Sequence, residues 1–392
     1  MANTKALVMQ SGGSTPVLNR SLFGIAKAVE ESNEISGLMG SLHGVEGLYA
    51  GNLVNLDIQN RSWWQRTART PGAILGSTRK RLQDDRVSEI IKILLDHSIG
   101  YLFIIGGNDS AETGHKIAAE ALSSNIDIRI VNVPKTIDND LAVTDHSPGY
   151  GSAARFVSLA TMGIGRDAET MGNASPITIM EVMGRNSGWL AAASAISKYE
   201  NMDAPHVICV PEIPIDETRF LDILADAYDR YGFAVAVVAE NTRGPNGVIG
   251  GQEIPYYTDE FGHAYFDGPA RYLGIAVSKH LKLRVRYEKP GTIQRSMVTC
   301  LSSTDSIEAE EAGRSAIQLA IKGYSDVMVT LLRNADGPYT CTTGISPLKD
   351  IAGVEKKIPE AYYDTSDYMV TSKFIDYATP LVGKPLPRFN RL

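Results

Sequence analysis

The sequence predicts an α/β protein of two doubly wound, Rossmann-like α/β/α domains, with the active site in the cleft between them. The length of 392 residues suits two domains of about 150 to 200 residues each. Short runs of continuous apolar residues recur along the chain, as expected for strands buried on both faces of a parallel sheet. Segments with apolar residues at three- and four-residue spacing separate them, and this alternation is typical of repeated βα units.

The predicted strands are the apolar runs at 6–10, 101–107, 128–134, 177–183, 206–212, 234–240 and 327–332. Amphipathic helical patterns follow several of them, for example at 86–99, 110–125 and 217–232. No low-complexity linker divides the chain, so we place the domain boundary near Gly149–Gly151, where glycines follow an acidic loop.

Composition narrows the setting of the protein. The formal net charge is −7 and no long basic run is present, which argues against a nucleic-acid partner. No segment approaches 18 uninterrupted apolar residues, so no membrane span is predicted. The three cysteines are odd in number and far apart, which favours neither a disulfide framework nor a cysteine metal site. A reducing cytoplasm is the expected location.

Glycines and charged residues gather where predicted strands end. These segments are SGGS at 11–14, GGNDS at 106–110 and PKTIDND at 134–140, and GSTR at 76–79 is a further segment of similar composition. Open α/β sheets bind ligands at the carboxyl ends of their strands, and glycine turns let the backbone approach a phosphate closely. The spacing matches neither the GxGxxG dinucleotide fingerprint nor a GxxxxGK[ST] loop. The segments therefore predict a phosphate site of another design.

These motifs resemble those of the bacterial-type phosphofructokinases. The resemblance continues in order through nearly the whole chain, with MEVMGRNSGW at 180–189, VPE at 210–212 and PGTIQRS at 290–296. It implies phosphoryl transfer to the 1-hydroxyl of fructose 6-phosphate, giving fructose 1,6-bisphosphate. It further implies a phosphoryl-donor domain at 1–150, completed by about 294–345, and a sugar-phosphate domain at 151–293, completed by about 346–392.

The catalytic group should include a base, because a sugar hydroxyl is a weak nucleophile at neutral pH. Asp138 matches the general base of the family in this resemblance. Thr136 and Asp140 flank it, and the resemblance implies that they position the transferred phosphoryl group and the sugar or metal. Arg79 could stabilise the charge on the transferred group.

The donor site is expected at Gly12, Gly13, Asn108, Asp109 and Lys135. In this resemblance, relatives that use ATP generally carry glycine at the positions of Asp109 and Lys135. The Asp109 carboxylate would repel the α-phosphate of ATP, whereas the Lys135 ammonium could neutralise a compact pyrophosphate. We therefore expect pyrophosphate as the donor, in a nearly reversible reaction of glycolysis or gluconeogenesis, with ATP as the alternative.

The resemblance also implies Mg²⁺ bridging the donor phosphates, with Asn108 and Asp109 as candidate ligands. Asn108 stands where the family usually has an aspartate, and an amide oxygen is a weaker partner for a hard cation than a carboxylate. Asp109 or Asp140 could compensate for this change.

The sugar-phosphate site is expected in the second half of the chain. The residues that match family positions there are Met183, Gly184, Arg185, Glu212, Arg286 and Arg295. Guanidinium groups suit bidentate phosphate contacts, so Arg286 and Arg295 are expected to clamp the sugar phosphate. In the family the equivalent of Arg286 reaches into a neighbour's active site, which implies a homodimer or homotetramer.

Two departures from the family leave alternatives open. Pro176 falls where relatives often place an arginine for the 6-phosphate, although Lys289 and Tyr287, close to Arg286 in sequence, could complete the phosphate site. A kinase acting on a related sugar phosphate therefore remains an alternative. A catalytically silent regulatory or sugar-phosphate-binding subunit is another, motivated by Asn108 and Pro176, but retention of Asp138 argues against it.

Overall fold

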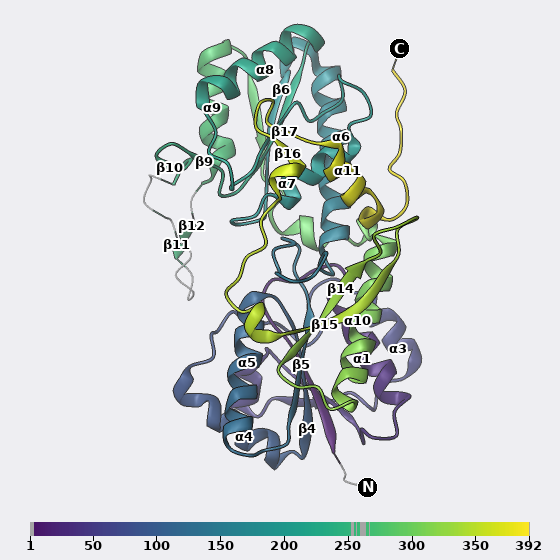
Figure 1. Ribbon diagram of the computed structural model, residues 1–392. Helices are drawn as coiled ribbons and strands as arrows, with labels where there is room; N and C mark the ends of the chain where they lie inside the picture. Colours follow the sequence, from purple (N-terminus) through teal and green to yellow (C-terminus); the bar gives the residue numbers. More distant parts are fainter. Residues whose placement is uncertain (1–3, 252–254, 256, 259–263, 266, 392) are drawn as a thin grey trace. The chain divides into compact units, whose positions relative to one another are not determined.

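The computed structural model describes residues 4–391 except 252–254, 256, 259–263 and 266 (Figure 1). The chain forms two compact units. Unit 1 contains Met1–Thr136, Asp140–Gly149 and Asp305–Glu355, and unit 2 contains Ile137–Asn139, Tyr150–Thr304 and Lys356–Leu392. Each unit has its own largely or wholly parallel sheet, so the predicted α/β class is confirmed.

Unit 1 is built on a seven-stranded sheet with the order β15-β14-β5-β4-β1-β2-β3. Its strands are β1 (Lys5–Gln10), β2 (Leu38–Ser41), β3 (Leu53–Asn55), β4 (Ile99–Gly106), β5 (Arg129–Pro134), β14 (Val327–Arg333) and β15 (Cys341–Pro347). Its helices are α1 (Leu18–Glu30), α2 (Val45–Ala50), α3 (Arg61–Thr67), α4 (Val87–Asp96), α5 (Asn108–Ser123) and most of α10 (Ser303–Ile321). The five strands from β14 to β2 run parallel, and the edge strands β15 and β3 are antiparallel to their neighbours.

Both faces of this sheet are covered, which explains why its strands are apolar without alternation. Ala6 and Val8 of β1 belong to the core shared with α1 and α10, whereas Leu7 and Met9 belong to the core shared with α4 and α5. The two pairs of helices lie on opposite faces of the sheet (Figure 1). Each such side chain, once buried, contributes about 1.5–3 kcal/mol of hydrophobic free energy.

Unit 2 is built on a four-stranded parallel sheet with the order β13-β6-β8-β7. Its strands are β6 (Ile177–Val182), β7 (Val207–Cys209), β8 (Ala234–Ala239) and β13 (Val285–Glu288). Its helices are α6 (Tyr150–Met171), α7 (Trp189–Ala193), α8 (Glu217–Tyr231), α9 (Pro269–Leu281) and α11 (Ser372–Ala378). Every residue of β6 and β8 is buried, as their continuous apolarity predicts.

The strand order brings separate sequence motifs to one edge of each sheet. In unit 1, β5, β4 and β1 are adjacent and parallel, so the segments after Pro134, Gly106 and Gln10 emerge side by side. In unit 2, β6, β8 and β7 are adjacent and parallel, so the residues after Val182, Ala239 and Cys209 do the same.

The structure adds two general facts. Within the described ranges, no helix is long and apolar enough to cross a membrane. Cys209, Cys300 and Cys341 are all free thiols.

Candidate active site

The glycine turn after β1 is joined to the loop that carries Arg79. The Gly12 amide donates to the Thr78 carbonyl at 3.0 Å, and Ser77 Oγ donates to the Gly12 carbonyl at 2.6 Å. Gly12 has a φ of +77°, which favours glycine. We expected the amides of this turn to face a phosphate, but the Gly12 amide already donates to the Thr78 carbonyl. The Gly13 amide, like that of Ser14, has no hydrogen-bond partner among the described residues.

Lys135 extends its side chain beneath this turn. The residue is only 3% exposed, and its Nζ donates to the Gly13 carbonyl at 2.7 Å. A Cβ on Gly12 would lie 3.1 Å from Nζ, so a larger residue would crowd the ammonium group. The backbone amide of Lys135 donates to Gly106 at the end of β4. The structure thus brings a buried positive charge to the glycine turn predicted to bind the donor.

Asp109 lies in the first turn of α5, where a negative charge interacts favourably with the helix dipole. Its Oδ1 is 3.6 Å from a guanidinium nitrogen of Arg81, and both side chains are substantially exposed. An ion pair this exposed is held weakly by the protein alone. Arg81 was not among the predicted site residues, and only its place two positions after Arg79 could have drawn attention to it.

Asn108 and Asp140 offer two oxygen ligands in unit 1. The Asn108 amide satisfies more hydrogen bonds when its NH₂ group faces the carbonyls of Ile351 and Val354, each at 3.2 Å. The other terminal atom, which is then the carbonyl oxygen, lies 3.4 Å from Asp140 Oδ2. An amide oxygen beside a carboxylate is the hard donor set that Mg²⁺ prefers. The residues present therefore fit the cation, with Asp140 supplying the charge that Asn108 lacks.

The segment from Lys135 to Asp140 alternates in burial. Its odd-numbered residues are buried, whereas Thr136, Asp138 and Asp140 are partly accessible. The Thr136 amide donates to the Pro148 carbonyl at 3.2 Å, which fixes this residue within unit 1. The three polar residues of this segment that were predicted to contact the substrates are therefore those that are partly exposed.

Asp138 belongs with unit 2, unlike Thr136 and Asp140. Its carbonyl accepts a hydrogen bond from Ser187 Oγ at 3.1 Å. The next residue, Asn139, has a φ of +55° and donates to the Tyr377 hydroxyl at 2.9 Å. These bonds hold the backbone around Asp138 to the unit that carries the predicted sugar site.

The loop after β6 carries Met183, Gly184 and Arg185, and two residues from distant segments hold it. Glu240 Oε1 accepts from the amides of Gly184 and Arg185 at 3.3 and 2.9 Å. Gln294 Oε1 accepts from the Met183 amide at 3.2 Å. Neither residue was predicted; a carboxylate at the end of the predicted strand 234–240 was the available signal for Glu240.

The two carboxylate oxygens of Glu212 differ in their hydrogen bonds. Its Oε1 accepts from the amides of Gly188 and Ile358, each at 3.1 Å. Its Oε2 is buried and has no hydrogen-bond partner among the described residues. Burial raises the pKa of this carboxyl, although the backbone bonds oppose the shift. A buried oxygen without a partner is costly, so a ligand hydroxyl at Oε2 would be favourable.

The remaining basic residues have different surroundings. Arg295 is partly buried and directly follows Gln294, the residue that contacts the Met183 amide. Arg286 lies on the edge strand β13 and forms an ion pair with Asp167 at 2.5 Å. Lys289 lies 2.6 Å from Oε1 of the buried Glu181, a salt bridge without good hydrogen-bond alignment, so its charge is engaged there.

The open parallel sheets and the glycine-lined, basic strand ends of unit 1 indicate an α/β protein of the phosphate-binding class. The family model for phosphofructokinase matches residues 5–320. The chain belongs to the phosphofructokinase family.

Individual relatives agree with this assignment. The pyrophosphate–fructose 6-phosphate 1-phosphotransferase of Rhodospirillum rubrum is 35% identical over 398 residues, which cover 100% of this chain and 97% of the relative. The protein of the same name from Xanthomonas campestris is 33% identical over 397 residues, covering 99% and 93%. The crystal structure of a pyrophosphate-dependent phosphofructokinase from Nitrosospira multiformis matches with a TM-score of 0.90 at 29% identity, covering 99% of this chain and 94% of that one.

Proposed function

We propose that this protein is a pyrophosphate-dependent phosphofructokinase, which transfers a phosphoryl group from pyrophosphate to the 1-hydroxyl of fructose 6-phosphate. The observation that carries the donor assignment is the buried Lys135 ammonium, held 2.7 Å from the Gly13 carbonyl beneath the glycine turn. A fixed cation suits a small, highly charged donor. The accessible Asp109 carboxylate opposes the extra phosphate of a nucleotide.

Asp138 acts as the base in this proposal. It takes the proton of the 1-hydroxyl while the oxygen of that hydroxyl bonds to phosphorus and the bridging P–O bond of pyrophosphate breaks. Inorganic phosphate leaves, and the protonated Asp138 can return its proton in the reverse reaction. Arg79, the Gly13 amide and Lys135 stabilise charge on the transferred and leaving groups, and Thr136 positions the transferred group.

Asn108 and Asp140 would hold Mg²⁺ through the two oxygens that lie 3.4 Å apart. The cation would neutralise charge on the donor phosphates when bound. Asp109, the other predicted ligand, instead contacts Arg81, so we assign it to donor selection rather than to the metal.

The sugar phosphate would bind in unit 2. Glu212 Oε2 would accept a sugar hydroxyl, and the 183–185 loop with Arg295 would contact the 6-phosphate. Arg286 would complete the phosphate site of a neighbouring subunit, which requires a homodimer or homotetramer. This role is compatible with its position on an edge strand.

A turnover assay tests the proposal. Purified protein is supplied with Mg²⁺, fructose 6-phosphate and either pyrophosphate or ATP, and fructose 1,6-bisphosphate is measured. We expect turnover with pyrophosphate. Turnover with ATP alone would overturn the donor assignment, and no turnover with either donor would point to a silent subunit or to another sugar phosphate.

A further inference from the structure

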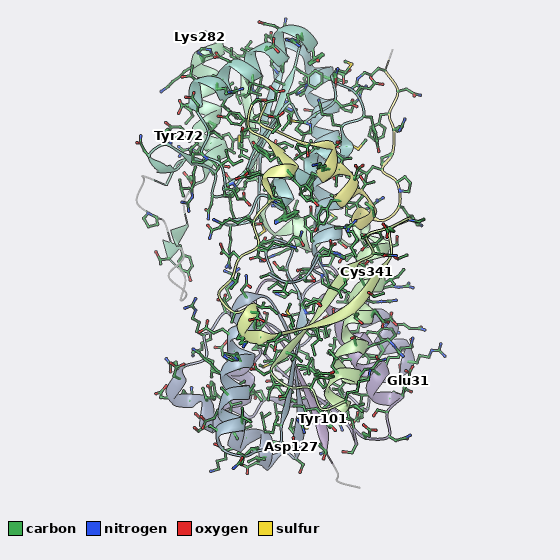
Figure 2. All side chains as sticks on the ribbon, in the orientation of Figure 1. Glu31, Tyr101, Asp127, Tyr272, Lys282 and Cys341 are labelled. Carbon is green, nitrogen blue, oxygen red and sulfur yellow. The ribbon has the colours of Figure 1, made fainter. Side chains whose placement is uncertain are left out.

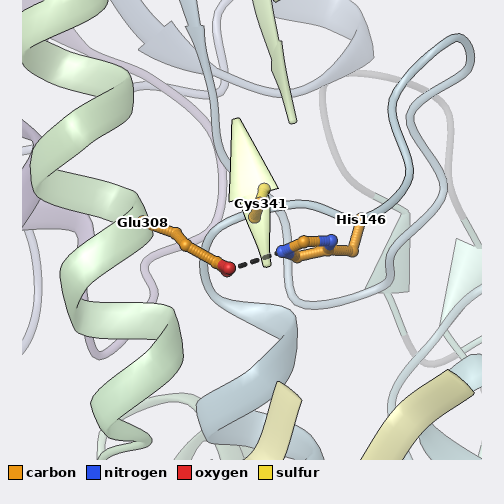
Figure 3. A group of neighbouring side chains, drawn as sticks. All are labelled: His146, Glu308 and Cys341. Carbon is orange, nitrogen blue, oxygen red and sulfur yellow. Dashed lines mark hydrogen bonds and ion pairs between the residues drawn. The ribbon is translucent and has the colours of Figure 1, made fainter. Parts of the chain in front are cut away.

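A cluster of His146, Glu308 and Cys341 lies in unit 1 outside the predicted active site. His146 comes from the loop that precedes α6, Glu308 from α10 and Cys341 from the start of β15. Cys341 is labelled in Figure 2. Figure 3 shows the three side chains converging. One ligand atom from each lies within 4.8 Å of the other two. His146 and Glu308 are 2% and 8% exposed, and Cys341 is partly buried.

The imidazole of His146 is oriented as in a metal-binding histidine. Its Nδ1 bonds Asp145 Oδ2 at 2.7 Å, and Asp145 is in turn held by Arg333 Nε at 3.1 Å. Histidines that bind metals usually donate their second ring nitrogen to a carboxylate in this way, which aims the other nitrogen at the metal. Here the other nitrogen, Nε2, points at Glu308 Oε2 at 2.6 Å.

Hydrogen bonds hold the cluster together without a metal. His146 bonds the carboxylates of Asp145 and Glu308, and Glu308 Oε1 accepts from the Tyr339 hydroxyl. A metal binds neutral imidazole, carboxylate and thiolate ligands, so binding of the ion would release protons from the cluster.

We propose that His146 Nε2, a Glu308 carboxylate oxygen and Cys341 Sγ bind a zinc ion. The mixed nitrogen, oxygen and sulfur set suits a borderline-soft cation, and it does not suit Mg²⁺. The Tyr339 hydroxyl lies beside these three ligands, since it bonds Glu308 Oε1 and lies 3.4 Å from His146 Nε2.

Only a small adjustment is needed to accept the ion. Zinc–ligand distances of about 2.0–2.3 Å place ligand atoms about 3.3–3.8 Å apart. The His146–Glu308 hydrogen bond, now 2.6 Å, would open by about 1 Å, and Cys341 Sγ would move inward by a similar amount from its place within 4.8 Å.

The bound ion would fasten the loop at 140–149 to α10 and β15. A second contact already joins the same loop and helix, because the Gly149 amide donates to Asp305 Oδ1 at 2.8 Å. This loop directly follows the Asp138–Asp140 segment in sequence, so zinc would stiffen the support of the predicted catalytic loop without touching a substrate.

Metal content tests the proposal without any substrate, so its outcome is independent of the proposed reaction. The full-length protein is stripped with a chelator, reloaded with Zn²⁺ or Co²⁺ in excess Mg²⁺, and dialysed. We expect one tightly bound Zn²⁺ per chain and, with Co²⁺, the charge-transfer absorption of a cobalt–thiolate bond. Cys341→Ser should abolish this absorption, and Glu308→Gln should weaken metal binding strongly.

Cys300→Ser is the matched control, because Cys300 is also a partly buried free thiol but lies in unit 2. It should keep both the metal and the absorption. Asp145→Asn should weaken metal binding by about 10- to 100-fold through its effect on His146. Wild-type protein that retains no more metal than folded Cys341→Ser, or an absorption that survives this substitution, would overturn the proposal.

Discussion

The two units end their parallel strands in opposite kinds of chemical groups. In unit 1 the strand ends present a buried ammonium group, Lys135, beneath a glycine turn. In unit 2 the corresponding edge presents carboxylates, with Glu240 bonded to loop amides and Glu212 keeping one buried oxygen without a protein partner. In our proposal this edge of unit 1 therefore binds the donor phosphates, whereas the same edge of unit 2 also offers an acceptor for a sugar hydroxyl, and the difference comes from a few residues after the strands.

The PKTIDND segment is divided between these two environments. Thr136 and Asp140 belong to unit 1, whereas Asp138 belongs to unit 2 and is bonded there through Ser187. A base that acts on a sugar hydroxyl should be held with the sugar, and groups that act on phosphate should be held with the donor. Variants in the two units should consequently change different kinetic constants.

The largest effect is expected at Asp138, where neither binding site should be altered. Asp138→Asn keeps the size of the side chain but removes the proton acceptor, so kcat should fall by about 10²- to 10⁴-fold. The KM values for both substrates should change little, as measured by steady-state kinetics. Ser187→Ala, which removes only the bond to the Asp138 carbonyl, serves as the milder comparison. A near-normal kcat in Asp138→Asn would remove this residue from the role of base.

Donor selection should respond to changes in unit 1. Lys135→Gly removes the cation beneath the glycine turn and should lower kcat/KM for pyrophosphate by about 10- to 150-fold, the range for a lost charged hydrogen bond. Asp109→Gly removes the carboxylate that opposes a nucleotide. The double variant should shift the pyrophosphate-to-ATP ratio of kcat/KM by at least about tenfold.

The two donor changes should not be additive, because both residues are expected to contact the same donor. Lys135→Met is the matched control for packing, since it keeps most of the buried volume but loses the charge and the hydrogen bond to the Gly13 carbonyl. The KM for fructose 6-phosphate should stay constant in all these variants. A donor ratio that is the same in wild type, both single variants and the double variant would contradict the assignment.

Glu212 should affect sugar binding alone. In Glu212→Gln one carboxylate oxygen becomes an NH₂ group, so the buried acceptor for a sugar hydroxyl is weakened and the KM for fructose 6-phosphate should rise about tenfold. The pH profile gives a second measurement. Because burial raises the pKa of Glu212 above 4.5, the wild-type KM should begin to rise, as pH falls, above the range of an ordinary glutamate. The KM of Glu212→Gln should not show this rise at low pH. If the pH dependence of KM were the same in the variant and in the wild type, ionised Glu212 would not be the acceptor.

The sequence predicted the strands better than it predicted the groups that hold the loops after them. β4, β5, β6 and β8 are largely buried on both faces, so their composition alone marks them as strands. The edge strand β13 was missed, because its residues are partly or fully exposed and carry no continuous apolar run.

The candidate site residues were predicted from motifs, but Glu240 and Gln294 were not predicted. They act on backbone amides of a loop that lies 55 and 111 positions away in sequence. Local spacing cannot reveal a side chain whose partner is the backbone of a distant segment. The same holds for the PKTIDND segment, whose central residues belong to unit 2. Their hydrogen bonds to Ser187 and Tyr377 also join segments that are distant in sequence.

Glu240 gives the smallest predicted effect, because it holds the sugar loop without contacting the sugar in our proposal. Glu240→Ala removes the acceptor for the Gly184 and Arg185 amides, and Arg185 must hold a φ of +47° without that support. The KM for fructose 6-phosphate should rise a few-fold, because the loop would contribute roughly 1 kcal/mol less to binding of the sugar phosphate. The kinetic constants for pyrophosphate should not change. Glu240→Gln retains an amide oxygen at this position and should restore most of the affinity. If alanine and glutamine gave the same KM, the hydrogen bonds would not be the source of the effect, and the carboxylate charge would have to act on the ligand directly.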